Sequence, residues 1–218
     1  MRNPDKSGGI SFSNLIPMTK IHFYIPVLKI CAHIGVAILL LYRKMRYGRA
    51  FRKIKLTRGK YAKVSQEDFA EINKHKWQAI NNQGDTFYAI RGVYINGRKK
   101  RLFMHREIMK PPPSDITQGG KRIVVDHKDG DGLNNTRKNL RIATATENTY
   151  NRKKYRKKCS SQYKGVSREK GSKRWRATVN YRGIPIRLGS FDSEIEAAKA
   201  YDEAARELYR EYAHLNFS

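Results

Sequence analysis

From residue 53 onward, the alternation of apolar and polar positions predicts a small mixed α/β unit. Residues 54–57 and 61–64 alternate on either side of a glycine-containing turn, which is typical of a β-hairpin. A short helix is expected to begin at Ser65, because acidic residues and then apolar positions at helical spacing follow it. Residues 87–94 and 98–104 predict a second hairpin, since the Asn-Gly pair between them is a strong signal for a two-residue turn.

The next segment predicts a strand, a long polar loop, a second strand and a helix. Residues 123–126 form a short apolar run that leads into His127, and residues 128–139 are rich in Asp, Gly and Asn. A second strand is expected over residues 140–143. Thr144-x-x-Glu147 then has the spacing of a capping box, which predicts a helix extending to about residue 158.

The last segment predicts three antiparallel strands followed by one helix. Residues 163–168, 174–181 and 184–188 alternate between apolar and polar positions, and the helix is expected to begin at Ser193. Its predicted buried stripe consists of Ile195, Ala198, Tyr201, Ala205 and Leu208. The predicted fold class is therefore α+β: a small N-terminal α/β unit, a ββα module, and a three-stranded antiparallel sheet packed on one helix.

Residues 1–50 differ from the rest of the chain. The apolar stretch 21–42 is interrupted by Pro26, Lys29 and His33, so it is a poor match to a membrane-spanning helix, which needs about 20 predominantly apolar residues. Three interpretations stay open: an extension upstream of a true start at Met45, which we favour, a membrane anchor, or an ordered helix. We do not expect membrane attachment.

The charge of the chain indicates a polyanionic partner. Its 46 Lys and Arg against 19 Asp and Glu give a net charge of +27, which favours nucleic acid over an anionic membrane surface. Two cysteines cannot form a disulfide framework or an all-thiolate zinc site, so we expect an intracellular, cytoplasmic protein whose metal ligands are oxygen or nitrogen atoms. Residues 151–160 hold six basic and no acidic residues, as expected of a basic linker between domains at 53–150 and 161–218.

Four polar residues in the ββα segment could carry out metal-dependent chemistry. Asp126 and Asn148 offer a carboxylate and an amide oxygen, which suit a divalent metal and Mg²⁺ in particular. His127 could act as a general base near neutral pH, and Asn139 could hold its imidazole in the required tautomer. From spacing alone, the favoured interpretation is structural: His127 as a surface histidine, Asn139 as a turn asparagine and Asn148 as a helix-start asparagine.

The sequence VVDHKDGDGLNNTRKNLRIATATENTYNRKK resembles the HNH endonuclease signature, in the branch found among phage and mobile-element homing endonucleases. This resemblance covers about residues 53–158 and implies a ββα-metal fold. By position, it implies that Asp126 and Asn148 bind the divalent metal, that His127 activates the water, and that Asn139 orients His127. His105, in the preceding MHREIM, is expected to be a core or phosphate-facing residue.

Residues 161–218 predict a DNA-contacting sheet face, since alternation places Arg174, Arg176, Thr178 and Asn180 opposite an apolar face. An ordinary solvated sheet is the alternative. The YKGV, W-x-A, LGSFDSEIEAAKAYDEAA and LNF motifs resemble the AP2/ERF DNA-binding domain, which docks a three-stranded sheet in the major groove. The polar sheet face and the resemblance to the AP2/ERF domain together imply six DNA-binding residues: Lys164, Arg174, Arg176, Thr178, Asn180 and Arg187. Phosphate contacts are expected from the linker residues Arg152, Lys153, Lys154, Arg156, Lys157 and Lys158.

These observations predict a metal-dependent HNH DNA endonuclease of homing type that nicks double-stranded DNA at a site selected by the AP2 sheet. No small-molecule substrate is expected, and a monomer is favoured. The alternative is a DNA-binding transcription regulator of AP2 type that does not cleave.

Overall fold

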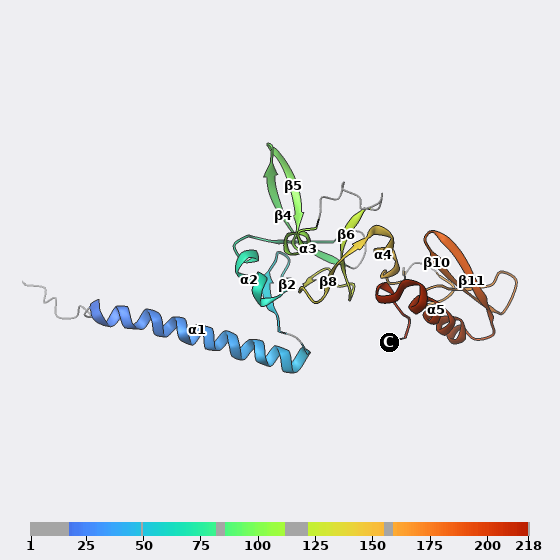
Figure 1. Ribbon diagram of the computed structural model, residues 1–218, viewed down its shortest axis with the longest axis horizontal. Helices are drawn as coiled ribbons and strands as arrows, with labels where there is room; N and C mark the ends of the chain where they lie inside the picture. The colour runs from blue at the N-terminus through green and yellow to red at the C-terminus, as the bar shows by residue number, and fades with distance from the viewer. Residues whose placement is uncertain (1–17, 49, 82–85, 112–121, 155–158, 218) are drawn as a thin grey trace, which may run out of the picture. The chain divides into compact units, whose positions relative to one another are not determined.

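The computed structural model describes residues 18–48, 50–81, 86–111, 122–154 and 159–217 (Figure 1). The chain divides into two units, residues 1–50 and 51–218. In the first unit, helix α1 spans Met18–Tyr47 without a break. Among the described residues, no helix is long and apolar enough to cross a membrane.

The second unit begins with two hairpins and two short helices. Both predicted hairpins form: β1 pairs with β2, and β4 pairs with β5 around the Asn-Gly turn. Strand β3, which extends the second hairpin to a three-stranded sheet, and helix α3 were not predicted from the sequence. The elements are β1 (Arg52–Lys55), β2 (Tyr61–Val64), α2 (Gln66–Ile72), β3 (Gln78–Asn81), β4 (Phe87–Ile95), β5 (Arg98–Phe103) and α3 (Met104–Met109).

The predicted strand–loop–strand–helix segment also forms. Strands β6 (Ile123–His127) and β8 (Leu140–Thr144) pair in antiparallel fashion, and helix α4 (Ala145–Tyr150) follows directly. The predicted capping box is present, because Thr144 and Glu147 exchange hydrogen bonds between side chain and backbone. Helix α4 ends at Tyr150, earlier than expected, since the next residue already serves as its C-cap. Residues 155–158 of the predicted helix lie outside the described residues.

A parallel strand pair connects the first hairpin to the polar loop. The two-residue strand β7 (Asn134–Asn135) lies within this loop and pairs with β2. The Arg137 side chain binds the Asp68 carboxylate, with an Nη2–Oδ1 distance of 2.7 Å, and the Arg137 amide donates to Ser65 Oγ. Apolar residues from both hairpins, both short helices, β6 and β8 form one core, so the loop is anchored on a packed scaffold.

The C-terminal part is a three-stranded antiparallel sheet packed on one helix, as predicted. Its elements are β9 (Val166–Arg168), β10 (Trp175–Tyr181), β11 (Ile184–Phe191), helix α5 (Glu194–Tyr209) and the 3₁₀ turn η1 (Arg210–Tyr212). Ala177 and Val179 of β10 are fully buried against the helix. The predicted helix stripe needs one correction: Ile195 is 49% exposed, because the buried face of the first turns is formed by Ala197 and Ala198.

The end of α4 packs into the core of this C-terminal sheet. The Tyr150 ring is stacked on that of Tyr209, with a centroid distance of 4.0 Å, and belongs to the same buried cluster as Val179 and Tyr201. The Tyr150 hydroxyl accepts a hydrogen bond from the Arg182 amide. The ββα segment and the sheet are therefore joined by a packed contact as well as by the chain between them.

Gly165 shows how tightly this sheet packs on its helix. Its φ of +75° lies in the left-handed region, and a Cβ built there would lie 2.0 Å from the Tyr201 ring and 2.8 Å from the Thr178 carbonyl oxygen. Gly171 has a similar φ of +73°, but no atom lies within 4 Å of its built Cβ. A side chain at either position would therefore meet backbone strain, but only a side chain at Gly165 would also overlap with neighbouring atoms.

We expect Gly165→Ala to lower the free energy of unfolding by about 2 kcal/mol more than Gly171→Ala, because only the former forces ring and backbone apart. Gly171→Ala is expected to cost about 1 kcal/mol through its left-handed backbone alone. Urea denaturation followed by tryptophan fluorescence measures both values. Equal losses would contradict the close packing of Gly165 on Tyr201.

Candidate active site

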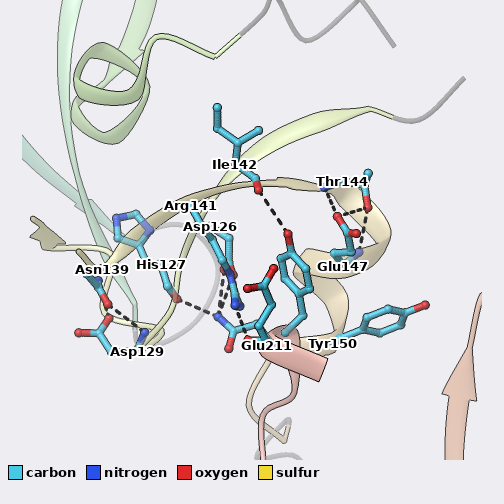
Figure 2. A network of polar contacts seen from close by, with 12 residues as sticks. Asp126, His127, Asp129, Asn139, Arg141, Ile142, Thr144, Glu147, Tyr150 and Glu211 are labelled. Atoms are coloured by element: carbon cyan, nitrogen blue, oxygen red, sulfur yellow. Dashed lines mark hydrogen bonds and ion pairs between the residues drawn. The ribbon is translucent and has the colours of Figure 1, made fainter. Parts of the chain in front are cut away.

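The buried Asp126 carboxylate is held by an arginine and an asparagine side chain (Figure 2). It lies near the end of β6, 5% exposed, directly opposite Arg141 of β8. Arg141 donates a hydrogen bond from Nε to Asp126 Oδ2 at 2.8 Å, and its Nη2 is ion-paired with the same oxygen at 2.7 Å. Asn151, at the end of α4, donates its amide to both carboxylate oxygens at 3.0 and 3.1 Å. A charge this buried is stable because it is both ion-paired and hydrogen-bonded.

His127 follows Asp126 and is equally buried. Its Nε2 lies 3.2 Å from Asn135 Oδ1, and its backbone carbonyl accepts from the Asn151 amide at 2.8 Å. Because a carboxamide oxygen only accepts, this arrangement assigns the proton to Nε2 and leaves the lone pair on Nδ1. Burial lowers the pKa of His127, against the opposing effects of Asn135 and of Asp129. The imidazole is therefore neutral at pH 7 and can accept a proton.

Aromatic rings surround the His127 imidazole. The centroid of the Tyr88 ring lies 5.9 Å from it and that of His105 lies 5.0 Å from it, both in edge-to-face geometry. Burial, the nearby His127 and Arg106 lower the pKa of His105 to about 3, so His105 is also neutral at physiological pH. His105, expected as a core or phosphate-facing residue, is thus largely buried and lines the site.

Asn139 does not contact the imidazole that it was expected to orient. Its Oδ1 accepts from the Asp129 amide at 3.1 Å, and its Nδ2 donates to Asp129 Oδ1 at 2.9 Å and to the Asn134 carbonyl at 2.8 Å. The side chain is needed inside the loop, whose backbone polar groups would otherwise be buried without partners. The asparagine that contacts the imidazole of His127 is Asn135, in β7.

Asn148 is the second residue that was expected to bind the metal. It lies in α4, partly buried, and its side chain has no hydrogen-bond partner among the described residues. Within the described chain, Asp126 Oδ1 accepts one hydrogen bond, whereas Oδ2 accepts two and is also ion-paired with Arg141 Nη2, so Oδ1 is the less occupied oxygen. A carboxylate and a carboxamide oxygen are hard donors, the kind of ligand that suits Mg²⁺. The described residues contain no group of three or more His, Cys, Asp or Glu that could hold a metal, so protein ligands would leave most positions for water and phosphate.

The outward face of the C-terminal sheet carries the predicted polar residues. Arg176, Thr178 and Asn180 alternate with buried residues along β10, and Arg187 of β11 lies opposite Thr178. The Glu169 carboxylate binds both Arg176, at 3.2 Å, and Arg187.

Arg174, at the edge of this face, donates to the Ser190 carbonyl at 2.7 Å and pairs with Asp192 at 3.3 Å. The face is therefore cationic, and its arginines are held in place by acceptors of the protein itself.

Lys164 lies elsewhere than the sheet face on which it was placed. Its ammonium donates to the Tyr150 carbonyl, and burial lowers its pKa to about 8. In the basic linker, the Lys154 ammonium donates to the carbonyls of Tyr163, at 2.7 Å, and Val166, at 3.0 Å. Arg152 and Lys153 are exposed. The predicted phosphate contacts Arg156, Lys157 and Lys158 lie outside the described residues.

Four residues of the site were not found from the sequence: Tyr88, Asn135, Arg141 and Asn151. A signal existed for Arg141, because a hairpin register that pairs His127 with Leu140 puts Arg141 opposite Asp126. No local sequence pattern predicts the positions of Asn135 and Asn151, because tertiary contacts bring both residues to the site.

Comparisons with known proteins find relatives for both parts of the chain. The AP2 domain family matches residues 161–211. An uncharacterized HNH endonuclease of Acanthamoeba polyphaga mimivirus is 31% identical over 159 residues, which cover 73% of this chain and 76% of the relative. Protein 3.8 of Escherichia phage T7 is 37% identical over 93 residues, 43% of this chain and 75% of that protein.

The C-terminal part also resembles plant proteins. Dehydration-responsive element-binding protein 2D of Arabidopsis thaliana is 49% identical over 59 residues, which cover 26% of this chain and 28% of the plant protein. No solved structure matches.

The lowered pKa of His105 predicts acid sensitivity. The unfolded chain binds a proton at this residue below about pH 6.5, whereas the folded protein does so only near pH 3, so stability is lost as the pH falls through this window. Between pH 6 and pH 4, His105 should contribute a slope of about 1.4 kcal/mol per pH unit to the free energy of unfolding.

In urea denaturation at a series of pH values, His105→Gln should flatten the slope by about this 1.4 kcal/mol per pH unit. The matched variant His33→Gln, on the exposed surface of α1, should keep the wild-type slope. A wild-type slope in His105→Gln would show that this imidazole is not buried in its neutral form.

Proposed function

Because the chain belongs to the HNH endonuclease family and carries a C-terminal AP2 domain, we propose that it is a metal-dependent DNA endonuclease of homing type. It hydrolyses a phosphodiester of double-stranded DNA, at a site selected by the AP2 sheet. The observation that carries the proposal is the buried pair Asp126 and His127 at the end of β6, in which the imidazole is neutral and held by Asn135.

His127 is the general base in this proposal. With Nε2 turned to Asn135, Nδ1 takes the proton from the attacking water, and the low pKa keeps this nitrogen unprotonated at neutral pH. Asn139 and Asp129 stiffen the loop that carries Asn135, so they keep the imidazole in one orientation. Tyr88 and His105 exclude bulk water from one side of the ring.

Asp126 and Asn148 would hold the divalent metal, with Mg²⁺ as the expected ion. When bound, the metal stabilises negative charge on the scissile phosphate and on the leaving oxygen. The described chain contains one such site, which fits cleavage of a single strand. Nicking by a monomer is therefore the proposed outcome.

The AP2 sheet supplies the DNA-binding surface. Arg174, Arg176, Thr178, Asn180 and Arg187 form its outward polar face, and Arg and Asn side chains can bind guanine and adenine edges in the major groove. The exposed linker residues Arg152 and Lys153 add phosphate contacts, which affect affinity without selecting sequence.

One observation favours a second function. The Asp126 carboxylate is already paired with Arg141, an arrangement that a DNA-binding regulator without nuclease activity could also use as a structural ion pair. Cleavage decides between the two functions, because both predict DNA binding.

We expect His127→Ala to lower the cleavage rate by at least about a hundredfold, because it removes the base, and to leave DNA affinity within about twofold. Supercoiled plasmids with random inserts, incubated with protein in Mg²⁺ or in EDTA, report nicking as conversion to open circles. His33→Ala, a change of the same type on exposed α1, is the control and should nick at the wild-type rate. Wild-type cleavage by His127→Ala would refute its role as base, and binding without cleavage by the wild type would favour the regulator.

We expect Arg187→Ala to weaken binding to the selected DNA about tenfold, since an arginine contact to a base edge contributes about 1–3 kcal/mol. The control is Arg206→Ala, on the exposed side of α5, whose other side packs against the sheet. Fluorescence anisotropy in EDTA measures affinity without cleavage. Equal affinities of the two variants would mean that this sheet face does not bind the DNA.

A further inference from the structure

Arg141 connects the candidate metal ligand to the C-terminal domain. On one side its Nε and Nη2 bind Asp126 Oδ2 at 2.8 and 2.7 Å. On the other side its Nη1 donates to the Glu211 carbonyl, and its guanidinium lies 4.2 Å from the centre of the Tyr212 ring (Figure 2). Both of the latter residues belong to η1, the turn that follows α5. A single side chain from β8 thus contacts the site and the AP2 domain.

The contacts of Arg141 determine the orientation of the Asp126 carboxylate. A guanidinium is planar and rigid, so fixing one nitrogen and one face also fixes the directions of the other N–H groups. Arg141 is only 10% exposed, and the Tyr212 ring covers its face. Its hydrogen bond and ion pair are both to Oδ2, and Oδ1 accepts only from the Asn151 amide among the described residues. Oδ1 is therefore the oxygen that stays open to a metal.

The position of η1 depends in turn on the DNA-binding sheet. The Tyr209 hydroxyl, at the end of α5, donates to the Asn180 carbonyl at 2.6 Å and accepts from the Asn180 amide at 3.1 Å. The same ring stacks on Tyr150 of α4. Strand β10, which carries Thr178 and Asn180 on its outward face, is thus bonded directly to the helix end from which η1 continues.

We propose that Arg141 is a positioning residue for the nuclease, and that the turn Arg210–Tyr212 of the AP2 domain completes the active site by holding it. The inference rests on the proposed function, because it assumes that Asp126 binds the metal. It assigns the AP2 domain a role in catalysis beyond target selection: without η1, Arg141 loses its carbonyl partner and its aromatic cover, and it orients the Asp126 carboxylate less firmly.

The test compares Tyr212→Ala with Tyr212→Phe in the full-length chain. The first removes the ring that covers Arg141, while the second keeps the ring and removes only a 3.5 Å contact to the Ile142 carbonyl. Tyr47→Ala, on exposed α1, controls for the loss of a tyrosine ring. Three quantities are measured: Mn²⁺ affinity without DNA by electron paramagnetic resonance, DNA affinity in EDTA, and the Mg²⁺ concentration at half-maximal nicking.

We expect Tyr212→Ala to weaken Mn²⁺ binding about tenfold and to raise the Mg²⁺ midpoint by a similar factor, since residues that orient metal ligands have effects of this size. DNA affinity should stay within about twofold of wild type. Tyr212→Phe and Tyr47→Ala should match wild type in all three measurements. Should Tyr212→Ala fail to fold, Arg141→Lys, which keeps the charge but loses the planar fork, should weaken Mn²⁺ binding in the same way.

An unchanged Mn²⁺ affinity in both Tyr212→Ala and Arg141→Lys would overturn the inference. Tighter Mn²⁺ binding would also overturn it, because Arg141 would then be a competitor of the metal. If the wild type binds Mn²⁺ but does not nick DNA, the proposed nuclease function fails, while the Mn²⁺ affinities still decide the role of Arg141. If the wild type nicks DNA but binds no Mn²⁺ in its absence, the Mg²⁺ midpoints of nicking decide the role of Arg141. If the wild type neither binds Mn²⁺ nor nicks DNA, both fail.

Discussion

The burial of the Asp126 carboxylate is the constraint on which the rest of the site depends. A carboxylate that is 5% exposed is stable in a folded protein only when cations and hydrogen-bond donors surround it. The donors come from two different segments, β8 and the end of α4, and β8's Arg141 is itself held by η1. Misplacing any of them would leave a buried charge without compensation, at a cost of several kcal/mol. The site is therefore inseparable from the packing of β6 on β8 and of Tyr150 on Tyr209.

The same burial makes His127 suitable for its chemistry. In water, a histidine is partly protonated near pH 6.5, and a protonated imidazole cannot act as a base. The surrounding rings of Tyr88 and His105 remove solvent, which disfavours the charged form and lowers the pKa. The nearby carboxylates oppose this effect, but desolvation is the largest contribution. The same buried environment that makes Asp126 depend on its partners therefore keeps the His127 imidazole neutral, so that it can accept a proton.

The sequence predicted those parts of the molecule that depend on local patterns. Hairpins, the capping box at Thr144, the three-stranded sheet and its helix follow from periodicity and turn residues over a few positions each. The roles within the loop did not follow, because they are set by tertiary packing. Asn135 faces His127 since β7 pairs with β2, some 70 residues away, and Asn139 is used by the loop itself. Lys164 likewise does not lie on the predicted polar sheet face, because its ammonium donates a hydrogen bond to the Tyr150 carbonyl. No local sequence pattern predicts that contact.

The excess of positive charge is arranged differently in the two parts of the proposed DNA-binding protein. In the site, Arg141 is buried and fully engaged, so it cannot exchange its carboxylate for phosphate without breaking the fold. On the sheet, Arg176 and Arg187 share the Glu169 carboxylate but are 40% and 57% exposed, so these ion pairs are weak and can exchange. If a DNA phosphate or base edge replaced Glu169, it would bind arginines that are already extended across the sheet face. Less side-chain entropy would then be lost on binding. Burial therefore separates the cation that supports the candidate active site from the cations that the proposed function assigns to DNA binding.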